Sequence, residues 1–171
     1  QVNRIFLLTT KFGGVNLPED NNYDIREINI DEIPVRSMQG KVVDFPDDLA
    51  TLIENSLASI TSQGGRCSGP PIIMYNKNTE YNSLETELEV AWPVADRSMA
   101  NKILPPIHAV SVKEKLSSER SLEDAYTALY NWIRKNGYHP AYPIREVLTP
   151  DPTADEQLLV EIIIPLTTEH P

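Results

Sequence analysis

Residues 121–137 read SLEDAYTALYNWIRKNG, which is the pattern of a single amphipathic helix. Ser121 is a residue type that caps helices at the N-terminus, and Asp124 follows three positions later. Gly137 is the residue type that ends helices in the left-handed conformation. We therefore predict a helix from about Ser121 to Asn136, with one apolar face that needs a sheet to cover. The residues that recur at helical spacing on this face are Leu122, Ala125, Leu129 and Ile133.

Strand patterns surround this helix. A strand is predicted before it, over residues 107–112, and two more follow it, over residues 144–148 and 158–166. In the last of these, LLVEIIIPL, successive side chains must point to opposite faces of the sheet. The second half of the sequence therefore has the order strand, helix, strand, strand.

The first half of the sequence repeats this order. When the chain is aligned with itself at an offset of 72 positions, residues 33–94 align with residues 105–166 without a gap. The predicted elements of the first half include a helix from Pro46 to Gly64-Gly65 and strands over 72–76 and 84–94, and another strand is predicted ahead of them over 23–30. The identical pairs include Pro34/Pro106, Leu57/Leu129, Gly65/Gly137, Pro71/Pro143, Glu89/Glu161 and Pro93/Pro165. A repeat of this length predicts two structural units of the same kind.

This order favours an α+β fold, in which two pseudo-symmetric strand-helix-strand-strand repeats share an antiparallel sheet with the helices on one face. A chain of 171 residues is long enough for one such domain but not for two domains and a linker. The polar cluster LPEDNN at residues 17–22 separates an N-terminal extension, residues 1–22, from a domain over residues 23–171. The repeat units are about 23–94 and 95–166, and two units side by side leave a seam between them.

The composition argues against several classes of function. The formal net charge is −10 and no run of basic residues is present, which argues against direct binding to nucleic acid, because phosphates need clustered Lys and Arg. Cys67 is the only cysteine, so an intrachain disulfide or a thiolate zinc cage is excluded and a cytoplasmic location is indicated. No apolar run is long enough to span a membrane. The motifs of common enzymes and histidine metal sites are missing, so we expect no metal and no cofactor.

Two glutamates lie between apolar residues of their own strand face. Glu146 lies between Ile144 and Leu148, and Glu161 has apolar neighbours on its face as well. A carboxylate in such a setting is costly to bury without a partner. Both residues are therefore candidates for recognising a ligand, with a surface position at a strand end as the alternative.

Four further residues are candidates for lining the seam between the units. Tyr75 and Trp92 combine apolar bulk with a hydrogen-bonding group, and their rings attract organic cations. Met74 is suited to an adaptable pocket wall. Glu89 is included because it aligns with Glu161 in the repeat. The alternatives are ordinary core packing for the first three residues and a solvated strand face of alternating glutamates for the last.

Several of these segments resemble GyrI-like domains, in the order that this family has. They are SGPPIIMYN over residues 68–76, LEVAWPV over 88–94, AYTALYNWIRKNGY over 125–138, PIREV over 143–147 and VEIIIPL over 160–166. The resemblance covers roughly residues 23–166. It implies the GyrI-like effector-binding fold, which is SOUL-like, with a hydrophobic cleft that binds drug-like molecules, often cationic and aromatic ones.

The resemblance also implies site residues. Ligand recognition in this family often centres on a glutamate in an aromatic-lined pocket, and that role falls on Glu146, with Glu161 second. Leu148 stands where the family usually has a tyrosine, so Trp92 or Tyr75 would have to supply the aromatic contact.

We therefore expect a binding module that captures amphipathic, cationic or aromatic small molecules, and we favour this role over an enzymatic one. Because no DNA-binding domain fits before Tyr23, the chain is similar to stand-alone relatives of the sensor domains of transcription regulators. Two alternatives follow from such relatives. One is a hydrolase of strained, cyclopropane-bearing toxic natural products with Glu146 as its catalytic base. The other is an interaction protein that protects DNA gyrase or works with a transcription regulator.

Overall fold

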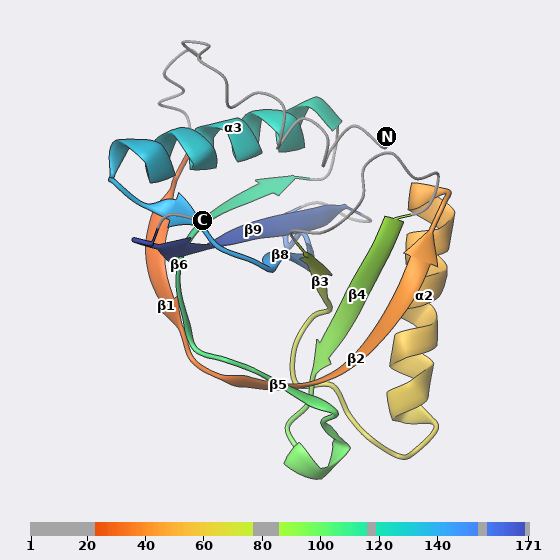
Figure 1. Ribbon diagram of the computed structural model, residues 1–171. Helices are drawn as coiled ribbons and strands as arrows, with labels where there is room; N and C mark the ends of the chain where they lie inside the picture. Colours follow the sequence, from red (N-terminus) through yellow and green to blue (C-terminus); the bar gives the residue numbers. More distant parts are fainter. Residues whose placement is uncertain (1–22, 77–85, 116–118, 154–156, 170–171) are drawn as a thin grey trace.

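The computed structural model describes residues 23–76, 86–115, 119–153 and 157–169, and the predicted extension over residues 1–22 lies outside them. The described residues form one curled antiparallel sheet and two long helices (Figure 1). None of the described helices is both long and apolar enough to cross a membrane. The elements are β1 (Arg26–Ile30), β2 (Ile33–Val42), α2 (Phe45–Thr61), β3 (Ile72–Tyr75), β4 (Thr86–Pro93), the short 3-10 helix η1 (Arg97–Met99), β5 (Lys102–Leu104), β6 (Ile107–Lys115), α3 (Glu119–Lys135), β7 (His139–Pro140), β8 (Ile144–Pro150) and β9 (Leu158–Thr167).

The order of the strands in the sheet is β1-β6-β9-β8-β3-β4-β2-β5, and β7 pairs with β9. β3 and β8, which come from different halves of the sequence, are adjacent at the centre. At the ends of the sheet, each half lends a strand to the other, because β1 pairs with β6 and β5 pairs with β2. Only Asp31 and Glu32 connect β1 to β2, although these strands lie near opposite ends of the order. The sheet therefore curls until its two ends approach each other (Figure 1).

The curl gives the sheet two different faces. α2 packs on β2 and β4 while α3 packs on β6 and β9, so both helices cover the outside of the curl (Figure 1). We call this side the helix face, and its core residues include Ile73, Val90, Ile144 and Ile162. We call the opposite side the inner face, and its core residues are Val35, Ile72, Met74, Ala91 and Leu104. The predicted α+β fold, with two helices on one face of an antiparallel sheet, is confirmed.

Both helices form where the apolar periodicity predicts them. Each is followed by a glycine with a positive φ, 75° at Gly64 and 74° at Gly137, a conformation that residues with a Cβ disfavour. α3 begins at Glu119, so Ser121 lies inside the first turn and not before it. The prediction of Ser121 as the N-terminal cap is therefore wrong, because a polar residue inside a first turn cannot be told from a cap by its type alone.

The two halves correspond in their helices at an offset of 73 positions, one more than the gapless alignment predicted. Gly64 and Gly137 share their positive φ. The carbonyls of Ile60 and Ile133 accept the backbone N–H groups of the residues five positions later, both at 3.0 Å. Gly137 therefore corresponds to Gly64, and its predicted match with Gly65 is wrong.

The strand after each helix shows the same error of one residue. The gapless alignment places Ile72 on Ile144, yet Ile72 lies on the inner face and Ile144 on the helix face. In the last strand of each unit the predicted match holds, since Glu89 and Glu161 both lie on the inner face. A one-residue change in a strand exchanges the two faces, which a count of identical residues does not reveal.

Candidate functional site

Glu146 lies at the centre of the helix face. It pairs with Ile73 of β3 on one side and with Ile162 of β9 on the other. Ile144 and Leu148 precede and follow it on the same face of β8. Glu146 is only 4% exposed, so its carboxylate is surrounded by aliphatic side chains. In such a low-dielectric setting, the attraction of a carboxylate for a cation is much stronger than in water.

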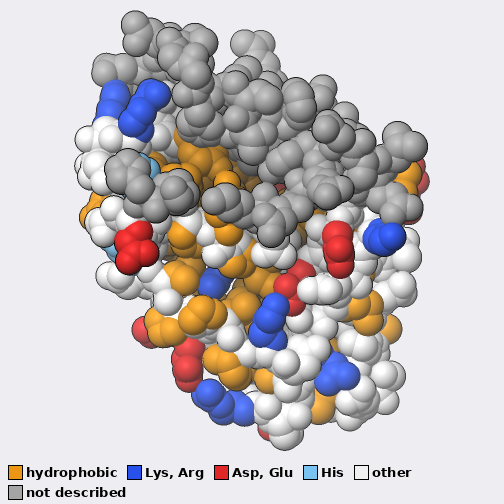
Figure 2. All heavy atoms as spheres, in the orientation of Figure 1, with side chains coloured by type: hydrophobic (Ala, Val, Ile, Leu, Met, Phe, Trp, Pro, Cys, Tyr) orange, Lys and Arg blue, Asp and Glu red, His pale blue; other side chains and the backbone are white. Residues whose placement is uncertain are grey.

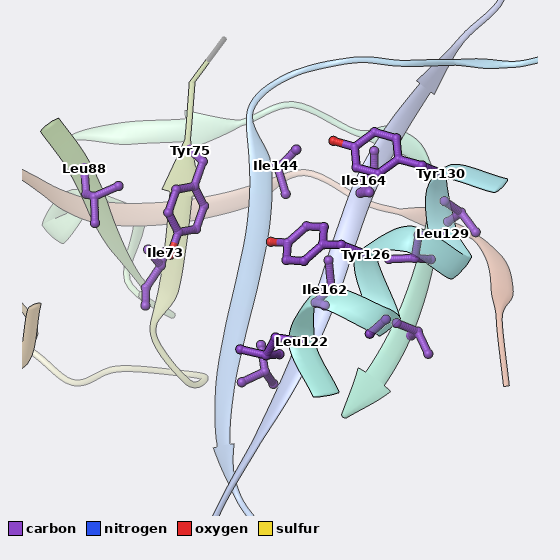
Figure 3. Packing of buried hydrophobic residues seen from close by; sticks show 14 of the residues in the cluster. Ile73, Tyr75, Leu88, Leu122, Tyr126, Leu129, Tyr130, Ile144, Ile162 and Ile164 are labelled. Carbon is purple, nitrogen blue, oxygen red and sulfur yellow. The ribbon is translucent and has the colours of Figure 1, made fainter. Parts of the chain in front are cut away.

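Helix α3 brings tyrosines to this carboxylate. Tyr126 and Tyr130 are separated by one helical turn, and Figure 3 shows their hydroxyl groups directed away from α3. The Tyr126 hydroxyl donates a hydrogen bond to Glu146. Burial, and after it the negative charge of Glu146, raises the pKa of Tyr126 well above its usual value of 10. The phenol of Tyr126 is therefore a neutral donor that holds the carboxylate in place.

Two further tyrosines enlarge this polar group. Tyr75 is buried on β3, on the other side of β8 from Tyr126 (Figure 3), and its proximity also raises the pKa of Tyr126. The hydroxyls of Tyr130 and Tyr142 form a hydrogen bond, and Tyr142 is 36% exposed. The site thus combines one buried carboxylate with four phenols, whose ring faces attract organic cations.

Trp92 lies on the part of the helix face that α2 covers. It is half-buried on β4, and its indole N–H donates to the hydroxyl of Ser56 on α2 at 2.9 Å. This hydrogen bond occupies the polar group of the ring. Trp92 can therefore offer a ligand its apolar ring but not its N–H.

The structure separates the predicted site residues into two groups. The residues on the helix face are Glu146, Ile144, Leu148, Tyr75 and Trp92. Met74, Glu89 and Glu161 lie on the inner face, because side chains alternate along β3, β4 and β9. They are therefore not brought together with Glu146.

The alternative of a solvated strand position is wrong for Glu89. Glu89 is 5% exposed, and both of its carboxylate oxygens accept hydrogen bonds from Lys102 Nζ, at 2.7 and 2.9 Å. Lys102 comes from β5, which the second half of the sequence contributes to this end of the sheet. The buried carboxylate is thus paired with a cation that no local pattern could indicate.

Tyr126 and Tyr130 were not among the predicted site residues. The signal that could have found them is their spacing of four residues on the apolar face of α3. Such a spacing is equally typical of core packing, so it becomes informative only together with Glu146.

Neither a metal site nor a reactive thiol is found in the part of the chain that the structure describes. No group of three or more His, Cys, Asp or Glu side chains there could hold a metal ion. Burial raises the pKa of the Cys67 thiol, which disfavours the nucleophilic thiolate.

Residues 23–167 match the sequence model of the GyrI-like small molecule binding domain family. The chain belongs to this family. No curated protein has a matching sequence. Among solved structures, the C-terminal domain of EcmrR is 22% identical to this GyrI-like domain with a TM-score of 0.70, and the match covers 86% of this chain and 99% of that one.

Two other solved structures share the fold at lower identity. A hydrolase from Listeria innocua is 10% identical with a TM-score of 0.54, over 84% of this chain and 91% of that one. SAV2435, solved with bound tetraphenylphosphonium, is 9% identical with a TM-score of 0.51, over 85% of this chain and 93% of that one. At these identities the likeness shows that the fold of this GyrI-like domain is shared.

Proposed function

We propose that this GyrI-like domain binds apolar organic cations on its helix face, in the region between α2 and α3, and that Glu146 recognises the positive charge. The observation that carries the proposal is the burial of the Glu146 carboxylate among aliphatic and aromatic side chains. The central strands β3 and β8 lie between the two helices, each of which packs mainly on outer strands. A ligand over the central strands would therefore contact Glu146 and the tyrosines of α3 together.

The surroundings of Glu146 favour one class of cation. A small, strongly hydrated ion would lose more hydration energy on entering this apolar site than the carboxylate returns. A bulky phosphonium or quaternary ammonium ion is weakly hydrated, and its apolar substituents gain from burial against Ile144, Leu148 and Ile162. The rings of Tyr75 and Tyr126 add attraction for the same kind of ion.

The fold comparison supports the choice of a test ligand. SAV2435, which shares the fold, was solved with a phosphonium ion bound. We therefore choose methyltriphenylphosphonium as the cation and triphenylphosphine oxide as a neutral molecule of similar shape. Calorimetry should show saturable binding of the cation and at least tenfold weaker binding of the oxide, and equal affinity would contradict the proposal.

The same samples separate binding from hydrolysis. If Glu146 acted as a general base on a strained electrophile, a cyclopropane-bearing ligand would be recovered with its ring opened. Binding alone leaves that ligand intact, which mass spectrometry of the recovered compound would show. The predicted roles in gyrase protection and with a transcription regulator, and the predicted cytoplasmic location, stay predictions.

A further inference from the structure

Arg145 lies next to Glu146 in β8 and faces the inner side of the sheet. It is 2% exposed, and its Nε and Nη1 atoms are buried without a hydrogen-bond partner. No hydrogen bond or ion pair links Arg145 to any residue in the described part of the chain. Buried guanidinium groups usually have partners, because the loss of hydration is otherwise uncompensated. Among the residues that the structure describes, Arg145 is therefore a cation that lacks an acceptor.

Glu89 and Glu161, two carboxylates of the same face, do not serve as this acceptor. Glu89 is held by Lys102 at 2.7 Å, and Glu161 lies 3.8 Å from Lys113. Each of these two carboxylates thus has its own lysine, and neither is paired with Arg145. Burial lowers the pKa of the Arg145 guanidinium below its usual range, as expected for a cation without a neutralising neighbour.

The residues around Arg145 are apolar. Met74 of β3 and Ile163 of β9 pair with it directly, and Val147 follows it on the same face of β8. Val147 is only partly buried at the edge of the inner core. Figure 2 shows apolar side chains gathered inside the curl, with basic and acidic side chains among them. A molecule that satisfies this surface needs an anionic group and an apolar body.

The geometry of the guanidinium group favours a carboxylate. Arginine binds a carboxylate through two parallel N–H groups, which are either Nε with Nη2 or Nη1 with Nη2. Nε and Nη1 are the two atoms that are buried and unbonded, while Nη2 does not belong to this fully buried set. A carboxylate that approaches Nη2 can therefore complete either pair.

We propose that the inner face is a second binding site, for an organic acid whose carboxylate pairs with Arg145 and whose apolar body lies against Met74, Val147 and Ile163. The site has the opposite charge preference from the helix face and lies on the other side of the same strand. It goes beyond the cation binding proposed above and does not depend on it.

Heteronuclear NMR of the arginine side-chain N–H signals tests the proposal directly. Decanoate is added to the isotope-labelled domain, and the Arg145 signal is identified by its absence in Arg145→Met. Decanoate should shift the Arg145 signal saturably, whereas acetate and inorganic phosphate, which carry the anion without the apolar body, should need at least tenfold higher concentrations. Decyltrimethylammonium, with the same chain and the opposite charge, should leave the signal in place.

Variants complete the test. Arg145→Met replaces the guanidinium group with an unbranched apolar side chain. It should weaken decanoate binding at least tenfold while methyltriphenylphosphonium binding stays unchanged. Lys113→Met removes an exposed cation from the same face and should change decanoate affinity less than threefold. Decanoate that binds Arg145→Met as tightly as the natural domain, or that fails to shift the Arg145 signal, would overturn the proposal. So would equal effects of decanoate and acetate.

Discussion

Replacing Glu146 with Gln removes one negative charge from the helix face and keeps the size of the side chain. The amide oxygen can still accept the hydrogen bond of Tyr126, so the shape of the site should persist. A cationic centre about 6 Å from the carboxylate, at an effective dielectric constant of about 20, gains roughly 3 kcal/mol. Since water that remains around a ligand screens part of this, we expect a loss of about 2–3 kcal/mol, or roughly 30- to 150-fold in the Kd of methyltriphenylphosphonium.

The neutral triphenylphosphine oxide should bind Glu146→Gln nearly as it binds the natural domain, because it has no charge for Glu146 to attract. Calorimetry with both ligands measures the difference. Glu161→Gln is the matched control, since it removes the same charge from the neighbouring strand but on the inner face. Equal losses for both ligands would mean that Glu146 shapes the site without recognising charge. Unchanged affinity for both would move the site elsewhere.

Three further predictions concern stability. The pKa of Tyr126 is higher in the folded protein than its unfolded value of about 10. Its contribution to the free energy of unfolding is therefore fully present below pH 10 and declines as the pH rises further, by about 1.4 kcal/mol per pH unit. In urea unfolding above pH 10, the free energy of unfolding should therefore fall less steeply with pH for Tyr126→Phe than for the natural domain. Gly64→Ala and Gly137→Ala should each lower the free energy of unfolding by about 1–2 kcal/mol in thermal unfolding, because φ is positive at both positions. An added Cβ meets nothing within 4 Å, so no steric clash adds to this cost. Ser56→Ala leaves the Trp92 indole N–H without its acceptor, which should cost about 1–2 kcal/mol and shift the tryptophan fluorescence.

The positions of the elements could be predicted from the sequence because they depend on local periodicity. The apolar residues of α3 recur at helical spacing, and the alternation in β8 places Glu146 between Ile144 and Leu148. The helical pattern involves residues one or two turns apart, and the strand pattern involves residues two positions apart, so both are local in the sequence. The location of Glu146 on an apolar strand face followed from such a pattern.

Features that depend on distant segments could not be predicted. The burial of Glu89 depends on Lys102, which reaches it only because β5 pairs with β2. The faces of β3 depend on its pairing with β8, so the self-alignment placed Ile72 on the wrong side. Local periodicity carries no information about which strands become neighbours.

The exchange of end strands between the halves has a consequence for folding during synthesis. When the chain has been made as far as β4, β1 has no neighbour, because its partner β6 has not yet been synthesised. One edge of β2 is likewise unpaired at this stage, because its partner β5 has not yet been synthesised. Neither half can finish its sheet alone, so a chain cut between the repeats should not yield two stable pieces. In a crowded cell, the waiting β1 of one nascent chain could pair with β6 of another, which would link two molecules by exchanged strands.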